Sequence, residues 1–191
     1  AQRLSYVGEL GFELYIENKD AKEIYQLIIE EGKNHNLSHC GSHAMDTMRM
    51  ESGFLHWGHD ISPEENQYQA GLSFTISQKK GVDFIGKQAL EKIKKEKISN
   101  RFAMFTLKES EPGKPLLLHD EPIYIDDKII GRSTSGNYSF NFKKNLVFGY
   151  INNDLSNDEL QSKNLFIEVE KKKYRISIQL EPLKRTDFKN L

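Results

Sequence analysis

Glu13 is carried by a short segment, residues 12–16, in which apolar and polar residues alternate. Because successive side chains of a strand point to opposite faces, the apolar residues share one face while Glu13 and Tyr15 share the other. A carboxylate fixed on a strand beside a glycine turn accepts two parallel hydrogen bonds from a planar, amidine-like edge, such as that of a pterin or a guanine. The alternative is that Glu13 is a solvated surface carboxylate, so this segment alone leaves the ligand open.

Trp57, the one tryptophan of the chain, directly follows His56 and is followed in turn by Gly58, His59 and Asp60. An aromatic ring beside a glycine and ionisable groups is a suitable wall for a flat polar ligand. The alternative is that Trp57 is a large core residue, which is the commoner use of aromatic side chains.

Six histidines and one cysteine raise the question of a metal site. His39, Cys40 and His43 are close in sequence, as are His56 and His59. Zinc requires three or four ligands that converge at about 2 Å. However, the chain has neither a Cys-x-x-Cys nor a His-Glu-x-x-His motif, and His39 and Cys40 fall in a predicted loop. We therefore expect no metal site.

Nucleophilic and phosphate-binding motifs are absent from the sequence as well. Cys40 has histidine neighbours, but the chain has no Gly-x-Ser-x-Gly elbow and no cysteine-protease pattern. Residues 7–12 contain two glycines without the Gly-Lys-Ser/Thr ending, or the third glycine, of a phosphate-binding loop. Cys40 is therefore predicted to be an incidental or packing thiol.

The bulk composition bounds the kind of protein. The 191 residues are enough for a sizeable core, as one domain or two small ones, and the formal net charge of −1 argues against nucleic acid or an anionic membrane as the main partner. No apolar run approaches the roughly 20 residues that span a bilayer, and no signal stretch opens the chain, so we expect a cytoplasmic protein. Because the chain opens on Ala1 rather than methionine, we expect it to be part of a longer protein.

The first hundred residues are predicted to mix helices and short strands. Helices are expected at residues 20–31, 42–51 and 86–97, and strands at 3–6, 12–16 and 70–76. In the first helix, apolar residues at helical spacing are expected to form a buried stripe, which consists of Ala21, Ile24, Leu27 and Ile28.

The second predicted helix is amphipathic, with Ser42 available as its N-cap. Ala44, Met45 and Met48 lie roughly on one face. Arg49, together with Asp46 and Met50, is expected to point elsewhere.

From Arg101 the pattern changes to short strands separated by turn residues, which indicates a small antiparallel barrel or sandwich. We place a boundary near Ser99, which divides the chain into an α+β part, residues 1–98, and a β part, residues 99–191. The expected strands are 101–107, 122–126, 128–135, 146–151, 164–170 and 174–180.

Several segments resemble motifs of the glycine-cleavage T-protein family of aminomethyltransferases. SYVGELGFELYI, at residues 5–16, resembles the family's YTGE-x-G-[FW]-E-[IL]-Y segment, and AMDTMRMESG, at 44–53, resembles its A-R-D-x-L-R-x-E-x-G helix. AGLSF followed by DFIGKQAL resembles A-x-L-x-[WF]…DFIG-x-x-AL, and GRSTSGNYS followed by NLVFGYI resembles G-x-[VL]-TSG-x-[FY]-S…A-x-GYV. Together these segments cover nearly the entire chain.

Other stretches are more similar to the folate-binding C-terminal region of sarcosine and dimethylglycine dehydrogenases and oxidases. These are YVGELGFELY, FLHWGHDISPEENQYQAGLSF and PIYIDDKIIG. The resemblance therefore favours a dehydrogenase-type parent protein over a stand-alone aminomethyltransferase.

The resemblance implies an α+β fold, in which an incomplete T-protein-like folate-binding α/β portion precedes a small antiparallel β-barrel. It also implies that a methylated amine or aminomethyl donor supplies a one-carbon unit, which tetrahydrofolate captures as 5,10-methylenetetrahydrofolate. By the same resemblance, Glu13 binds the pterin edge, Tyr6 lines the same pocket, and Trp57 falls where the family carries an aromatic residue. FAD, where the parent protein carries it, belongs to an upstream domain and not to this chain.

The sequence departs from the family pattern at Met45, where the family has an arginine that helps to hold the substrate. Methionine offers no donor fork for a carboxylate. No stretch matches the family's amino-terminal half, which carries an aspartate that assists the chemistry, so the catalytic residues stay unknown. The alternatives are a non-catalytic folate-binding or scaffold domain, a stand-alone glycine-cleavage aminomethyltransferase, and a folate-dependent demethylase acting on sulfur or oxygen methyl groups.

Overall fold

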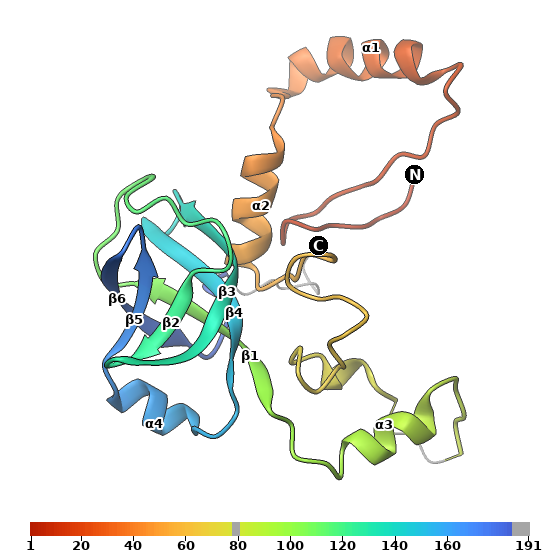
Figure 1. Ribbon diagram of the computed structural model, residues 1–191. Helices are drawn as coiled ribbons and strands as arrows, with labels where there is room; N and C mark the ends of the chain where they lie inside the picture. The colour runs from red at the N-terminus through yellow and green to blue at the C-terminus, as the bar shows by residue number, and fades with distance from the viewer. Residues whose placement is uncertain (78–80, 185–191) are drawn as a thin grey trace.

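The computed structural model describes residues 1–77 and 81–184, and in them a helical region precedes a β-barrel (Figure 1). The helices at 42–51 and 86–97 expected from the sequence are present, the second of them shorter than expected. The elements before the barrel are α1 (Ala21–Gly32), η1 (Lys33–His35), α2 (Ser42–Glu51), η2 (Ser73–Thr75) and α3 (Lys87–Ile93).

The second half of the chain forms a closed antiparallel barrel with the strand order β1-β4-β3-β2-β5-β6. This confirms the prediction of a small antiparallel barrel. A short helix, α4 (Asn157–Ser162), precedes β5 and begins with a capping box between Ser156 and Glu159. The strands are β1 (Asn100–Leu107), β2 (Pro122–Ile125), β3 (Lys128–Ser139), β4 (Lys144–Asn152), β5 (Leu165–Val169) and β6 (Lys172–Gln179).

The barrel contains the main hydrophobic core of the described residues. Ile123, Val147 and Ile167 are fully buried at its centre. In β5 the buried residues alternate with half-buried ones, as the two-residue period of a strand requires. β1 begins directly after the expected boundary at Ser99, and the division of the chain into two domains stays a prediction.

Strands β3 and β4 approach each other closely at two glycines. A Cβ atom at Gly149 would overlap the carbonyl oxygen of Arg132, and one at Gly131 would overlap that of Tyr150. Only a residue without a side chain allows the two backbones this separation. These glycines therefore permit the close spacing of β3 and β4 in the part of the barrel against which α2 packs.

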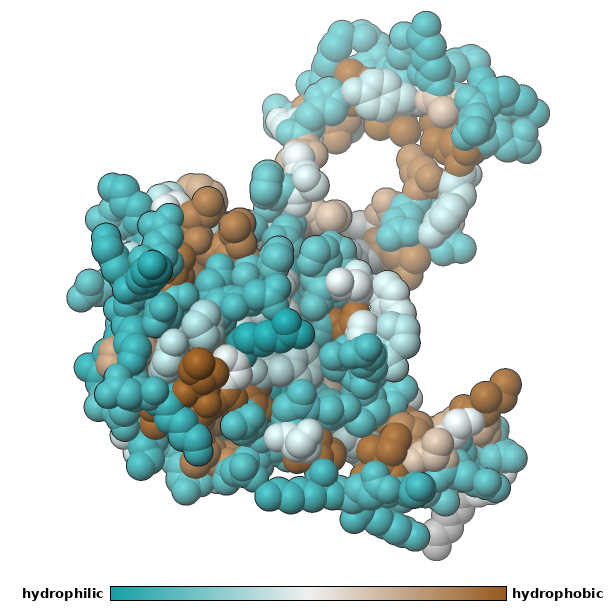
Figure 2. Space-filling model, viewed as in Figure 1, coloured by the Kyte–Doolittle hydropathy of each residue, from teal (hydrophilic) through white to brown (hydrophobic). Residues whose placement is uncertain are grey.

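The apolar stripe expected on α1 is exposed, so the prediction of burial was wrong. Leu27 is 62% and Ile28 is 39% exposed. The helix lies away from the barrel (Figure 1), and apolar side chains gather around the opening beneath it (Figure 2). The amphipathic pattern correctly predicted the helix, but no other described element covers its apolar face.

The strands expected before the barrel did not form either. The segments around 3–6 and 12–16 pair only through an isolated bridge between Gln2, just before the first segment, and Glu13, whose backbones exchange two hydrogen bonds of 2.9 Å. Residues 70–76 fold into turns and the short helix η2. A strand requires a continuous partner, and these segments have none among the described residues.

The helices of the described residues are too short and too polar for any of them to span a membrane.

We predict that Gly149→Ser destabilises the protein, because the new side chain must push β3 away from β4. Overpacking of this kind costs about 1–3 kcal/mol. The matched control is Gly41→Ser, at a position with no atom within 4 Å of the new Cβ, where serine is a favoured N-cap. Thermal unfolding of the full-length protein measures both, and an equal loss of stability in the two variants would contradict the packing argument.

Candidate functional site

Helix α2 packs a largely polar face against the barrel. Arg49 is 1% and Glu51 is 0% exposed, and Met50 is buried as well. Met45, which helical spacing places on another face together with Ala44 and Met48, is 43% exposed. The hydrogen-bonding groups of β3, together with the apolar contacts of Met50, select the face of α2 that carries Arg49 and Met50.

Arg49 is held by ion pairs and hydrogen bonds on both sides of its guanidinium group. Its Nε donates to Asp46 at 2.7 Å, and its Nη1 donates to Asp60 at 2.5 Å. Its Nη2 donates to Ser135 of β3 at 2.7 Å. The guanidinium carbon also lies 5.3 Å from the ring centre of Phe148, a cation–π geometry.

Asp60 completes this network from the loop that follows α2. Besides Arg49, its carboxylate accepts hydrogen bonds from the backbone N–H of His56 at 2.9 Å and from Thr134 and Ser135 at 2.5 and 2.8 Å. The register of β3 against β4 shifts between Ser133 and Ser135. This irregularity turns two consecutive hydroxyls toward one carboxylate, which a regular strand does not allow.

Glu51 forms a second buried contact between α2 and the barrel. Its carboxylate accepts hydrogen bonds from Ser139 at 2.5 Å and from Asn141 at 2.9 Å. A buried charge is tolerated only when it is paired or hydrogen-bonded in this way. Arg49 and Glu51 therefore fix both the rotation and the depth of α2 on the barrel.

A cavity of about 350 Å³, which we call the histidine pocket, opens beside this network. Its walls come from Tyr6, from α2, from the loop after α2, and from the barrel residues around β3 and before β2. Its polar residues include His43, Asp46, Arg49, His56, His59, His119, Thr134, Ser135 and Asn137, and its apolar ones include Met45, Leu116, Leu117 and Leu118.

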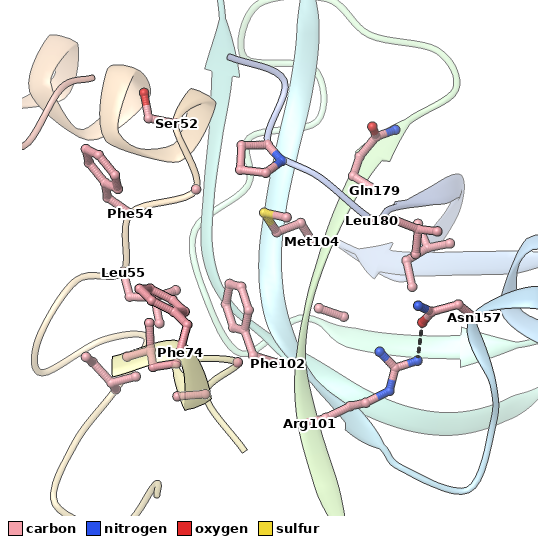
Figure 3. Close-up of a pocket in the computed structure, with 18 of the residues that line it drawn as sticks. Ser52, Phe54, Leu55, Phe74, Arg101, Phe102, Met104, Asn157, Gln179 and Leu180 are labelled. Carbon is pink, nitrogen blue, oxygen red and sulfur yellow. Dashed lines mark hydrogen bonds between the residues drawn. The ribbon is translucent and has the colours of Figure 1, made fainter. Parts of the chain in front are cut away.

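A second cavity of about 680 Å³, which we call the apolar groove, lies between residues 52–74 and the barrel strands β1 and β6 (Figure 3). Phe54, Phe102 and Met104 are among its mostly apolar lining residues. Its few polar groups include Arg101 and Asn157, which bond to each other at 2.8 Å. The groove is larger than the histidine pocket, but its polar groups do not converge on one point.

Of the three site residues predicted from the sequence, Tyr6 is the one that lines a cavity. It borders both the histidine pocket and the apolar groove. Its hydroxyl donates to the carbonyl of Leu55 at 2.8 Å, and its ring stacks on Phe54 with 6.3 Å between the ring centres. Partial burial raises the pKa of the Tyr6 hydroxyl, so this group stays a neutral donor at physiological pH.

Glu13 and Trp57 lie outside both cavities. The carboxylate of Glu13 is exposed and accepts a hydrogen bond of 2.7 Å from Tyr15, a contact that raises the pKa of the tyrosine. Trp57 is 65% exposed, so it is not the core residue of the alternative prediction. The structure thus does not bring Glu13, Tyr6 and Trp57 together into one site.

The residues that sequence reasoning missed are Arg49, Thr134 and Ser135. Nothing in the helical periodicity of α2 marks a buried arginine, and the two hydroxyls look like ordinary strand residues. Asp60 stood out in the sequence only as a neighbour of His59. Among the described residues, no group of three or more histidine, cysteine or acidic side chains is arranged to hold a metal ion, and Cys40 is exposed.

Comparison with known protein families matches both halves of the chain. Residues 1–80 match the GCVT N-terminal domain, and residues 100–184 match the glycine cleavage T-protein C-terminal barrel domain. The chain belongs to the glycine-cleavage T-protein family. The family resemblance of the sequence motifs is thereby confirmed.

Similar proteins in this family include both dehydrogenases and transferases. Human dimethylglycine dehydrogenase is 35% identical over 187 residues, which cover 98% of this chain and 21% of that protein. The aminomethyltransferase of Symbiobacterium thermophilum is 34% identical over 149 residues, which cover 78% of this chain and 39% of that protein. This chain thus spans about a fifth of the length of the dehydrogenase.

The fold of this chain also resembles that of a solved aminomethyltransferase structure. The glycine cleavage system aminomethyltransferase T from Bartonella henselae superimposes with a TM-score of 0.79 at 22% sequence identity. The match covers 96% of this chain and 49% of the Bartonella chain. The α+β fold with a C-terminal barrel is therefore the T-protein fold.

We predict that Asp60→Asn destabilises the full-length protein by about 3–5 kcal/mol, because it removes the fully buried one of the two carboxylates that pair with the buried Arg49 guanidinium. Urea unfolding followed by circular dichroism measures the change. The control is Asp127→Asn, which removes a fully exposed carboxylate paired with Lys173 and should leave the unfolding midpoint nearly unchanged. Similar midpoints for the two variants would refute the role of Asp60.

Proposed function

We propose that this chain is the tetrahydrofolate-binding portion of a one-carbon transferase. In this proposal a methylated amine or an aminomethyl carrier provides the one-carbon unit, and the product is 5,10-methylenetetrahydrofolate. Tetrahydrofolate, when bound, supplies the ring nitrogens that accept the carbon. The proposal rests on family membership together with the site geometry.

The observation that carries the proposal is the position of Tyr6 in the histidine pocket. The family motif at residues 5–16 and the motif helix at 44–53 are far apart in sequence, yet Tyr6 of the first lines one cavity with Met45 and Asp46 of the second. A cavity of about 350 Å³ that is lined by both apolar side chains and hydrogen-bonding groups suits a small planar polar ligand. The residues present therefore fit part of a pterin site.

Within this proposal Tyr6 forms a wall of the ligand site. Glu13, which lies outside the histidine pocket, is assigned to the pterin edge by the family motif alone. Tyr15 donates a hydrogen bond to Glu13, and no described cation pairs with its carboxylate. The carboxylate thus keeps the capacity for a bidentate, charge-assisted contact. Trp57 is exposed on the loop that carries His56 and His59. We propose that it covers the ligand from outside rather than packing in the core.

We further propose that the parent protein is of the dimethylglycine or sarcosine dehydrogenase type. In support, similarity to dimethylglycine dehydrogenase runs over 98% of this chain, against 78% for the aminomethyltransferase of Symbiobacterium. FAD would then belong to a different part of the parent protein. Met45, on the pocket wall, instead favours a second candidate, a domain that binds folate without transferring a one-carbon unit.

We predict that Glu13→Ala in the full-length protein weakens folinic-acid binding about tenfold, the usual loss when a hydrogen bond to a charged group is removed. Isothermal titration calorimetry measures the dissociation constant. Glu17→Ala is the matched control, because Glu17 is an exposed carboxylate a few residues away that pairs with Lys19. Unchanged affinity in Glu13→Ala would remove Glu13 from the site.

We predict that the purified full-length protein shows the visible absorption of an oxidised flavin, because a dehydrogenase-type parent needs a redox cofactor. The control is the same protein after reduction with dithionite, which should bleach the visible bands of the flavin. A colourless protein that still transfers a one-carbon unit to tetrahydrofolate would favour a stand-alone aminomethyltransferase. Folate binding without any transfer would favour the non-catalytic domain.

A further inference from the structure

Four imidazoles line the histidine pocket, and they come from three separate parts of the chain. His43 lies in the first turn of α2, His56 and His59 lie on the loop after α2, and His119 lies on the connection that leads to β2. The ring centres of His56 and His59 are 4.5 Å apart, and those of His59 and His119 are 6.5 Å apart. The fold thus arranges three imidazoles in a row along one cavity.

Most of the hydrogen-bonding capacity of this row is unused. Within the described part of the chain, the side chains of His43, His56 and His59 form no hydrogen bond. His119 differs, because its Nδ1 lies 2.8 Å from Asp120, which leaves its Nε2 for another partner. A neutral imidazole offers one N–H donor and a protonated one offers two. The row therefore presents several free donors to the cavity.

The charged groups around the row are already paired with one another. Asp46 and Asp60 both accept hydrogen bonds from Arg49, and Asp120 accepts one from Arg132. Tyr6 donates its hydroxyl to a backbone carbonyl and stays neutral. Consequently, the imidazoles are the groups on this wall that remain available to a ligand.

The chemistry of the row suits a carboxylate better than a phosphate. Phosphate sites rely on lysine or on the free fork of an arginine. Among the described residues no lysine lines the pocket, and the one arginine that does, Arg49, is engaged by two carboxylates and a hydroxyl. Imidazole N–H groups carry a smaller and pH-dependent charge, which matches a group with a single negative charge.

We propose that His56, His59 and His119 bind a carboxylate group of the ligand that occupies the histidine pocket. This inference rests on the proposed function, in which two ligands carry a carboxylate: the glutamyl end of a folate and an N-methylated amino acid that donates the carbon. Both present the same chemistry to the row, and the experiment distinguishes them.

The test measures four dissociation constants on the full-length protein by calorimetry. Folinic acid is compared with 5-formyl-6-methyltetrahydropterin, which has the same ring without a carboxylate, and N,N-dimethylglycine is compared with trimethylamine. The variant is His56→Gln combined with His59→Gln. The matched control is His35→Gln combined with His39→Gln, because neither of these histidines lines the pocket.

We expect the pocket variant to bind one of the two carboxylate compounds about tenfold more weakly, the loss typical of a charge-assisted hydrogen bond, with its carboxylate-free counterpart unaffected. A loss on folinic acid assigns the row to the folate tail, and a loss on dimethylglycine assigns it to the donor. Unchanged affinity for both overturns the proposal. If the wild-type protein binds dimethylglycine through the row but neither pterin compound, only the proposed folate function is overturned. If it binds none of the four probes, the proposed folate function and the carboxylate proposal are both overturned.

A pH series on the unaltered protein provides a readout that does not depend on the variant folding. Imidazole is the side chain that ordinarily changes its charge between about pH 5 and 8. The affinity for the carboxylate compound should rise as the pH is lowered, because a protonated imidazole attracts an anion more strongly than a neutral one. A flat profile overturns the proposal.

Discussion

The buried pair of Arg49 and Asp60 is the contact on which the arrangement of this chain depends. Arg49 comes from α2 and Asp60 from the loop that follows. Two hydroxyls of β3, those of Thr134 and Ser135, form hydrogen bonds with this pair. Removing two charges from water is expensive, and the cost is offset only when every polar atom finds a partner. The network therefore admits one placement of α2 and its loop on the barrel.

This placement positions the histidine pocket. Asp60 accepts the backbone N–H of His56, so the network that anchors α2 also fixes the start of the loop that carries His56 and His59. The barrel supplies the remaining walls from strands whose spacing is set by close glycine contacts at Gly131 and Gly149. A rigid scaffold thus presents exposed side chains on a loop, which is the usual construction of a ligand site.

The two parts of the chain differ in how far they bury their apolar residues. The barrel buries its own, because strands pair locally and close on themselves. The helical region does not, and Leu27 on α1 and Phe74 on η2 remain largely exposed. An amphipathic pattern decides that a helix forms, but another element must be present to cover it.

The sequence by itself determined the strands of the second half, the helices and the family, because strand alternation, helical spacing and motifs are read directly along the chain. The strand pattern left a barrel or a sandwich open, and the family resemblance favoured the barrel. The sequence also singled out Tyr6, which lines a cavity. Only the tertiary structure decided that Arg49 turns inward, that Thr134 and Ser135 reach one carboxylate across an irregularity in β3, and that His119 joins His59. These choices depend on contacts between residues far apart in sequence, where the cost of leaving a buried charge unpaired outweighs helical periodicity.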